Sequence, residues 1–187
     1  MSILSLSSLA EALRMQKLIA GMALGVLTSA IVGCDTAFVA DILPTKEIVP
    51  AVPATPTPYS ALEQSIHQQI NQYRQSQKLP PLTLDPRISE QARAHSRNMA
   101  SGKVTFSHQG FEQRVEAIRR SIFYLAAAEN VAFNYGYSNP AQQAVEGWIK
   151  SPGHLINIEG QYNLTGIGVD RNAKGEYYFT QIFIRRW

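Results

Sequence analysis

The C-terminal segment EYYFTQIFIRR, residues 176–186, constrains the fold more than any other part of the sequence. Successive side chains of a β-strand point to opposite faces, so a strand with one solvated face alternates apolar and polar residues. Here both alternating sets are largely apolar: Tyr178, Thr180, Ile182 and Ile184 in one, and Tyr177, Phe179, Gln181 and Phe183 in the other. The segment is therefore predicted to be an interior strand that is covered on both faces. The preceding NLTGIGVD, joined to it by RNAKG, is predicted to pair with it as a β-hairpin.

Apolar residues at helical spacing predict helices ahead of this hairpin. The first begins near Ser60, which forms a capping box with Glu63. Asp85-Pro86 and Asn139-Pro140 each join a capping side chain to a first-turn proline, and so predict two further helix starts. The apolar stripes are Leu62, Ile66, Ile70 and Tyr73; Ile88, Ala92, His95 and Met99; Phe111, Val115 and Ile118; and Ala141, Ala144, Val145 and Trp148. Helices followed by strands indicate the α+β class, with the helices packed on the sheet.

The N-terminal segment has the features of an export signal. Residues 18–33 carry no charged side chain, follow the basic residues Arg14 and Lys17, and are shorter than the roughly 20 residues of a membrane span. The segment ends in Ile31-Val32-Gly33-Cys34, which resembles a bacterial lipobox, and Cys34 is the only cysteine of the sequence. We expect residues 1–34 to be a lipoprotein-type signal peptide with Cys34 as the lipidated residue. The alternative is an uncleaved anchor with a buried thiol.

A proline-rich spacer follows. Residues 35–59 hold five of the ten prolines of the chain, Pro44, Pro50, Pro53, Pro56 and Pro58. Repeated proline favours an extended polyproline II conformation, so the segment is predicted to be a semi-rigid linker. The folded domain is predicted to span residues 60–187. We expect an exported protein of a bacterial cell envelope, tethered to the membrane through Cys34 and facing away from the cytoplasm.

The charge pattern argues against a nucleic-acid partner. The sequence has a formal net charge of +3 and a pI of about 9.1, but its densest basic groups are the two separate pairs Arg119-Arg120 and Arg185-Arg186. A nucleic-acid binder usually gathers basic residues on one face. No nucleic-acid partner is therefore expected.

Three polar residues, His108, Glu129 and His154, stand out against apolar or turn-forming surroundings. Glu129 follows three alanines and precedes Val131-Ala132, so it is expected to be at least partly buried. A buried carboxylate has to be paired with a donor or protonated, and two histidines are natural partners. The alternative is that Glu129 and Asn130 cap a local turn. His95, on an apolar helix face, is interpreted as a residue that supports the core.

Five motifs in a fixed order resemble the bacterial branch of the CAP superfamily, also called SCP-like, which groups cysteine-rich secretory proteins, antigen 5 and pathogenesis-related proteins. They are FSH (106–108), AENVA (128–132), WIKSPGHLINI (148–158), GIGV (166–169) and YFTQIF (178–183). The resemblance covers residues 60–187 and implies an α-β-α sandwich with a central antiparallel sheet. It also implies a cleft that holds His108, Glu129 and His154, with Ser151 at the position where eukaryotic members have a second glutamate.

This resemblance implies a candidate metal site. His108, Glu129 and His154 would offer three ligands to Zn²⁺ or another divalent metal, with an open position for water. Asn157 and Gln181 each interrupt an apolar stretch and are expected to support the wall of the cleft.

The resemblance leaves three functions open. The chain is expected to be a binding module for a small molecule, lipid, peptide or cell-wall component. The alternatives are a metal-dependent hydrolase or protease that uses the same cleft, and a structural or interaction domain whose polar cluster fixes the packing. Ser151, His154 and Glu129 also supply the residue types of a nucleophile, a base and an orienting acid.

Overall fold

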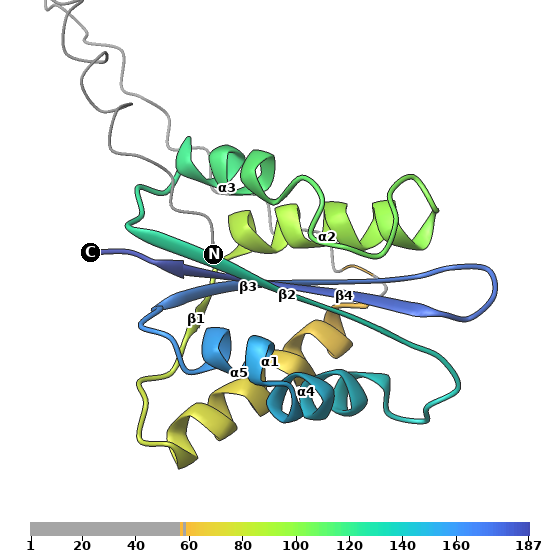
Figure 1. Ribbon diagram of the computed structural model, residues 1–187, viewed down its shortest axis with the longest axis horizontal. Helices are drawn as coiled ribbons and strands as arrows, with labels where there is room; N and C mark the ends of the chain where they lie inside the picture. The colour runs from red at the N-terminus through yellow and green to blue at the C-terminus, as the bar shows by residue number, and fades with distance from the viewer. Residues whose placement is uncertain (1–56, 58) are drawn as a thin grey trace, which may run out of the picture. The chain divides into compact units, whose positions relative to one another are not determined.

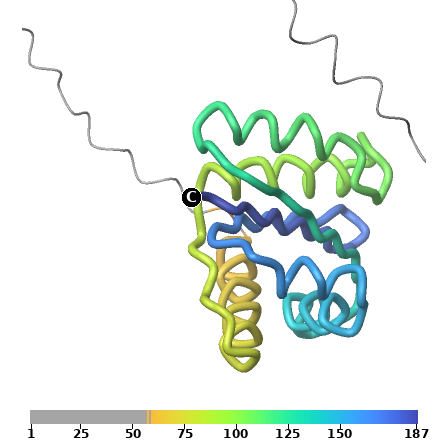
Figure 2. The backbone as a smooth tube through the Cα atoms, turned by 60° about the vertical axis from the view of Figure 1, so that its left-hand side comes forward, coloured from red at the N-terminus to blue at the C-terminus, as the bar shows by residue number. Residues whose placement is uncertain are grey.

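The computed structural model describes Thr57 and residues 59–187, which form an α-β-α sandwich (Figure 1). The helices α2 (Pro86–Ala100) and α3 (Phe111–Arg119) cover one face of the sheet. The helices α1 (Ser60–Ser76), α4 (Pro140–Lys150) and α5 (Pro152–Ile158) cover the other, and a second view shows the same layers (Figure 2). The predicted three-layer fold is therefore confirmed. The predicted signal peptide, with Cys34, and most of the predicted linker lie outside the described residues.

Within the described residues the sheet has four strands in the order β1-β3-β4-β2. Their bounds are Thr83–Leu84 for β1, Ala126–Asn134 for β2, Leu164–Arg171 for β3 and Tyr177–Arg185 for β4. The interior position predicted for Tyr177–Arg185 is confirmed, because β4 pairs with β3 on one side and β2 on the other. The sheet is not wholly antiparallel, since the two-residue β1 runs parallel to β3.

Two of the three predicted helix caps are confirmed. The side chain of Asp85 accepts a hydrogen bond from the backbone N–H of Arg87, and that of Asn139 accepts one from Gln142. The prediction of a capping box formed by Ser60 and Glu63 is wrong, because Ser60 is already the first helical residue. The side chain of Glu63 forms an ion pair with Arg93 instead. Among the helices of the described part of the chain, none is long and apolar enough to cross a membrane.

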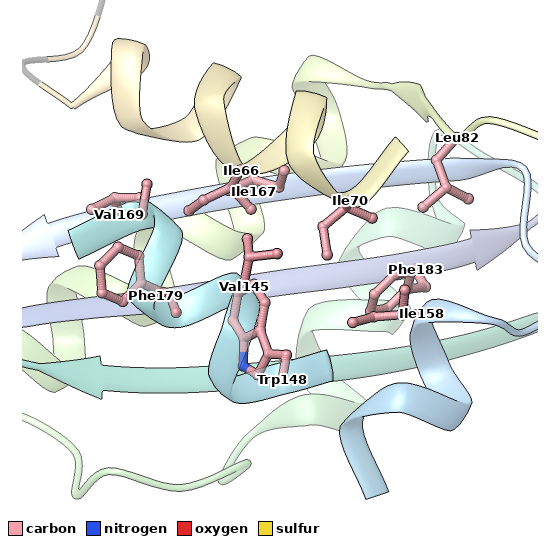
Figure 3. Close-up of a cluster of buried hydrophobic side chains, with 12 residues drawn as sticks. Ile66, Ile70, Leu82, Val145, Trp148, Ile158, Ile167, Val169, Phe179 and Phe183 are labelled. Atoms are coloured by element: carbon pink, nitrogen blue, oxygen red, sulfur yellow. The ribbon is translucent and has the colours of Figure 1, made fainter. Parts of the chain in front are cut away.

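Each face of the sheet carries its own hydrophobic cluster. The larger cluster lies between the sheet and the layer of α1, α4 and α5, and includes Trp148, Phe179 and Phe183 (Figure 3). The indole N–H of Trp148 donates to the backbone carbonyl of Val131 at 3.0 Å, which ties α4 to strand β2. The second cluster, around Ile118 and Ile182, lies under α2 and α3. Because β2 pairs only with β4 in the described residues, it forms one edge of the sheet.

Candidate functional site

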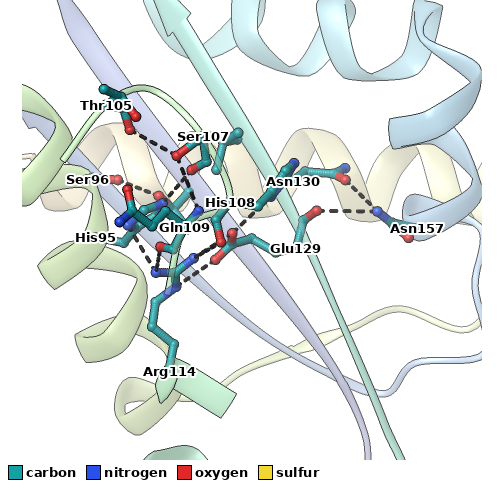
Figure 4. Close-up of polar contacts among 12 residues, drawn as sticks. His95, Ser96, Thr105, Ser107, His108, Gln109, Arg114, Glu129, Asn130 and Asn157 are labelled. Atoms are coloured by element: carbon teal, nitrogen blue, oxygen red, sulfur yellow. Dashed lines mark hydrogen bonds and ion pairs between the residues drawn. The ribbon is translucent and has the colours of Figure 1, made fainter. Parts of the chain in front are cut away.

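Glu129 is the buried centre of a polar cluster, whose outer member His108 has a side chain that is 54% exposed. Glu129 lies on β2 opposite Ile182 of β4, whose side chain belongs to the core under α2 and α3, and the residue is only 6% exposed. Its Oε1 accepts hydrogen bonds from His108 Nδ1 at 3.0 Å and from Arg114 Nη2 at 2.8 Å (Figure 4). Its Oε2 accepts a third from Arg114 Nε, also at 2.8 Å. The turn-capping alternative is wrong, because Glu129 and Asn130 lie within a nine-residue strand.

Sequence reasoning missed Arg114, although a signal was present. In α3 it follows Phe111 by three residues and precedes Ile118 by four, so it lies on the face that the apolar stripe buries. A charged residue on such a stripe requires a buried partner of opposite charge. The partner is Glu129, and the two side chains form a bidentate ion pair in which Arg114 is 10% exposed.

His95 supports Arg114 from the other side. Its Nδ1 lies 3.1 Å from Arg114 Nη1, and its Nε2 lies 2.9 Å from the carbonyl oxygen of Ser107. A guanidinium can only donate, so Nδ1 of His95 accepts and the ring proton is on Nε2, which donates to Ser107. Burial lowers the pKa of His95, and the charge of Arg114 lowers it further. The ring is therefore held neutral, in keeping with its interpretation as a residue that supports the core.

His154 is placed by α5, which Pro152 opens directly after α4 ends. Asn130 of β2 donates to the carbonyl of His154 at 3.1 Å, and Asn157 donates to Asn130 Oδ1 at 2.8 Å. These bonds connect the middle of β2 to α5. Burial and the nearby His108 both lower the pKa of His154, and its buried Nδ1 has no hydrogen-bond partner among the described residues.

A groove of about 520 Å³ runs along the edge of β2 between the loop at Phe106 and helix α4. The residues that line it are Phe106, Val131, Ala132, Phe133, Asn134, Tyr135, Tyr137, Gln143, Ala144, Gly147, Trp148, Ser151 and His154. Among these described lining residues there is no Asp, Glu, Lys or Arg. Four aromatic residues remain between 45% and 63% exposed, namely Phe106, Phe133, Tyr135 and Tyr137. The groove is thus uncharged and rich in accessible aromatic rings.

The candidate residues named from the sequence fall into four places. Ser151 and His154 line the groove, whereas His108 and Glu129 belong to the polar cluster beside it. Asn157 contacts the backbone carbonyl of Glu129 at 3.4 Å as well as Asn130, so it supports strand β2. Gln181 was expected at the cleft wall, but it is fully buried on the interior strand β4 and donates to Thr165 instead.

The use of His108, Glu129 and His154 as zinc ligands stays a prediction. In the described part of the chain, no group of three His, Cys, Asp or Glu side chains lies close enough together to hold a metal ion. The serine-based triad has no bond between His154 and Glu129 in this geometry, since the histidine paired with Glu129 is His108.

The structure is an α-β-α sandwich in which the half-exposed His108 pairs with the buried Glu129 beside a groove. Comparison with known sequences gives the family of this domain. The sequence model of the cysteine-rich secretory protein (CAP) family matches residues 67–183, and the chain belongs to this family. The uncharacterized protein YkwD of Bacillus subtilis is 34% identical over 143 residues, which are 75% of this chain and 53% of YkwD. The chain thus spans about half the length of that relative.

Two solved structures extend the comparison. An extracellular protein of Bacillus anthracis with an SCP domain is 29% identical, with a TM-score of 0.54 over 70% of this chain and 44% of the other. An outer surface protein of Borrelia burgdorferi has a TM-score of 0.60 over 70% of this chain and 97% of its own, at 16% identity. This second likeness shows the fold alone. Together with the family match, the extracellular description of the Bacillus anthracis protein supports export of the chain.

Proposed function

We propose that this chain is an exported binding domain whose aromatic groove holds an uncharged glycan segment. The observation that carries the proposal is the lining of the groove, which presents accessible aromatic rings and no formal charge among its described residues. Ligand sites in proteins are concave and mostly apolar, with a few polar groups that fix orientation.

The shape and chemistry of the groove suit a sugar better than an ionic ligand. Sugar rings have apolar C–H faces that stack on aromatic side chains and hydroxyl groups that need hydrogen-bond partners. Phe106, Phe133 and Tyr135 offer such rings, while Gln143 and Ser151 offer polar groups within the same lining. His154 adds an imidazole that its lowered pKa keeps neutral near pH 7. A strongly charged ligand would lack a counter-charge along this lining.

The proposed location agrees with a cell-wall ligand. The expected lipidation of Cys34 and the proline-rich segment after it would tether the domain to a membrane and hold it at a distance from the surface. A groove on such a domain would meet glycans of the envelope. The extracellular description of the similar Bacillus anthracis protein supports a location outside the cytoplasm.

Calorimetric titration of the full chain with N-acetylglucosamine oligomers tests the proposal. We expect saturable binding that Tyr135→Ala weakens about tenfold, which corresponds to roughly 1.4 kcal/mol. Phe123→Ala is the matched control, because Phe123 is also 63% exposed but lies outside the groove lining. Absence of binding by the full chain, or equal weakening by both substitutions, would contradict the proposal.

A hydrolase is the second candidate, and one observation favours it. Glu129 accepts from Nδ1 of His108, which orients the ring and leaves Nε2 without a partner among the described residues. A histidine held in this way can act as a general base. If the chain is a hydrolase, mass spectrometry will detect cleavage of the same oligomers, and His108→Ala will abolish that cleavage without abolishing binding.

A further inference from the structure

The cluster of the buried His95, Arg114 and Glu129 with the half-exposed His108 does not fit the three-ligand metal site that the family resemblance implies. The reason is the position of Arg114. We propose that Arg114 is the resident cation of this cluster and takes the place next to Glu129 that a metal ion would need. The domain then holds His108 and Glu129 in position without Zn²⁺. This proposal is argued from the contacts of Arg114 and Glu129 and not from the lining of the groove. It is therefore independent of the proposal that the groove binds a glycan.

The carboxylate of Glu129 is close to saturated with hydrogen-bond donors. A carboxylate has about four lone-pair positions. Three are used here, because Oε1 accepts from both His108 and Arg114 and Oε2 accepts from Arg114. A metal ion at the remaining position would lie close to the guanidinium in a site where the side chain of Glu129 is only 2% exposed. Two positive charges would then share one carboxylate in a poorly solvated place, which is unfavourable.

Arg114 cannot easily move away from this position. Its Nη1 donates to His95 Nδ1 at 3.1 Å and to the carbonyl of Gln109 at 2.9 Å. Gly110, with a φ of 79°, lets the chain turn closely around the guanidinium, since a Cβ there would lie 3.3 Å from Nη1. Withdrawal of Arg114 would leave the buried acceptor of His95 without a donor, which is costly in a protein interior.

The ligands that remain are too few for a zinc site. The carboxylate accepts from His108 Nδ1, so the lone pair of the neutral ring is on Nε2. With Glu129 occupied, the site would retain two imidazoles, His108 and His154. Catalytic zinc sites have three protein ligands and structural sites have four, so this set is incomplete. Arg114 therefore acts as a positioning residue that fixes the carboxylate and, through it, the tautomer of His108.

Zinc titration of the full chain tests the assignment. After treatment with EDTA, the wild type and His108→Ala are titrated with ZnCl₂ by calorimetry in the absence of glycan. We expect no one-to-one zinc site that depends on His108 in the wild type. Arg114→Met removes the guanidinium at similar length. We expect this variant to gain a one-to-one zinc site, at least tenfold tighter than any residual zinc binding by the wild type, that is lost again with His108→Ala.

Two further measurements keep the test decisive if Arg114→Met fails to fold. Arg114→Lys retains the charge, and we expect it to fold and to remain without a zinc site. Long-range ¹H–¹⁵N spectra of the wild type report the His108 tautomer, which we expect to be protonated on Nδ1. A wild-type zinc site that His108→Ala or Glu129→Gln abolishes, or a His108 protonated only on Nε2, would overturn the proposal. Loss of glycan binding alone would not affect it.

Discussion

Gly168 is the position where a single methyl group should do the most damage to this domain. It lies on β3, directly beneath α2, and a Cβ at this position would be 2.1 Å from the backbone nitrogen of Arg93 and 2.3 Å from the carbonyl carbon of Ala92. These neighbours are backbone atoms, so no side-chain rotation can relieve the contact. In Gly168→Ala the whole of α2 has to move away from the sheet.

Two contributions lower the free energy of unfolding in Gly168→Ala. Overpacking of a filled interior costs about 1–3 kcal/mol when neighbours can adjust, and we take the upper end because backbone must move. The displacement also strains the hydrogen bond from Ser96 Oγ to the carbonyl of Gly168, 2.9 Å long and buried, which is worth about 1 kcal/mol. We therefore expect Gly168→Ala to lower the free energy of unfolding by about 3–4 kcal/mol, a large share of the roughly 5–15 kcal/mol typical of a domain.

Urea denaturation followed by far-ultraviolet circular dichroism measures this loss, and Gly147→Ala is the matched control. Gly147 is exposed within α4, and a Cβ there would meet nothing within 4 Å. The same substitution should raise the free energy of unfolding by up to about 1 kcal/mol, because alanine favours helix over glycine. The reasoning would be refuted if Gly168→Ala lowered the free energy of unfolding by less than about 1 kcal/mol. It would also be refuted if both substitutions changed the free energy of unfolding in the same direction, because the effect would then not be due to the close approach of α2 to β3.

Three other predictions concern buried polar contacts. Trp148→Phe removes the donor to the Val131 carbonyl and some packed volume, so urea titration should show a loss of about 2 kcal/mol; a loss below about 0.5 kcal/mol would contradict the contact. Burial and the neighbouring guanidinium lower the pKa of His95, so the folded state binds fewer protons than the unfolded chain. The contribution of neutral His95 to the free energy of unfolding is fully present above the unfolded pKa of about 6.5 and is lost as the pH falls from there towards the lowered pKa. The Tm of His95→Gln should therefore fall less than the Tm of the wild type between about pH 7 and pH 5. Equal falls in Tm would refute this. Arg93→Met leaves the carboxylate of Glu63, which is 3% exposed, without its ion-pair partner and should cost about 3–5 kcal/mol in urea, whereas the double variant with Glu63→Gln should regain part of that loss.

The polar cluster shows how far sequence reasoning reached at the site. The alanine-rich surroundings of Glu129 were enough to expect its burial and a histidine partner, and the structure places His108 at 3.0 Å from it. Nothing in the local pattern indicated that AAAENVAFN forms a strand, because this segment lacks a clear alternation of apolar and polar residues. The segment is a strand because it pairs with β4 along its whole length, and this pairing is a tertiary contact that the local sequence does not indicate. The aromatic groove along this strand could not be predicted for the same reason.

Local patterns in the sequence by themselves determined the interior strand Tyr177–Arg185, the helix starts at Pro86 and Pro140, and the order of motifs that marks the family. These features could be predicted because burial of a strand on both faces and the capping of a helix each require particular residue types within a few neighbouring positions. The tertiary structure alone decided that Arg114 pairs with Glu129 and that the groove opens along β2. The ion pair joins segments that approach only when α3 packs on the sheet, and the groove lies between the loop at Phe106, strand β2 and helix α4, which come together only in the folded domain.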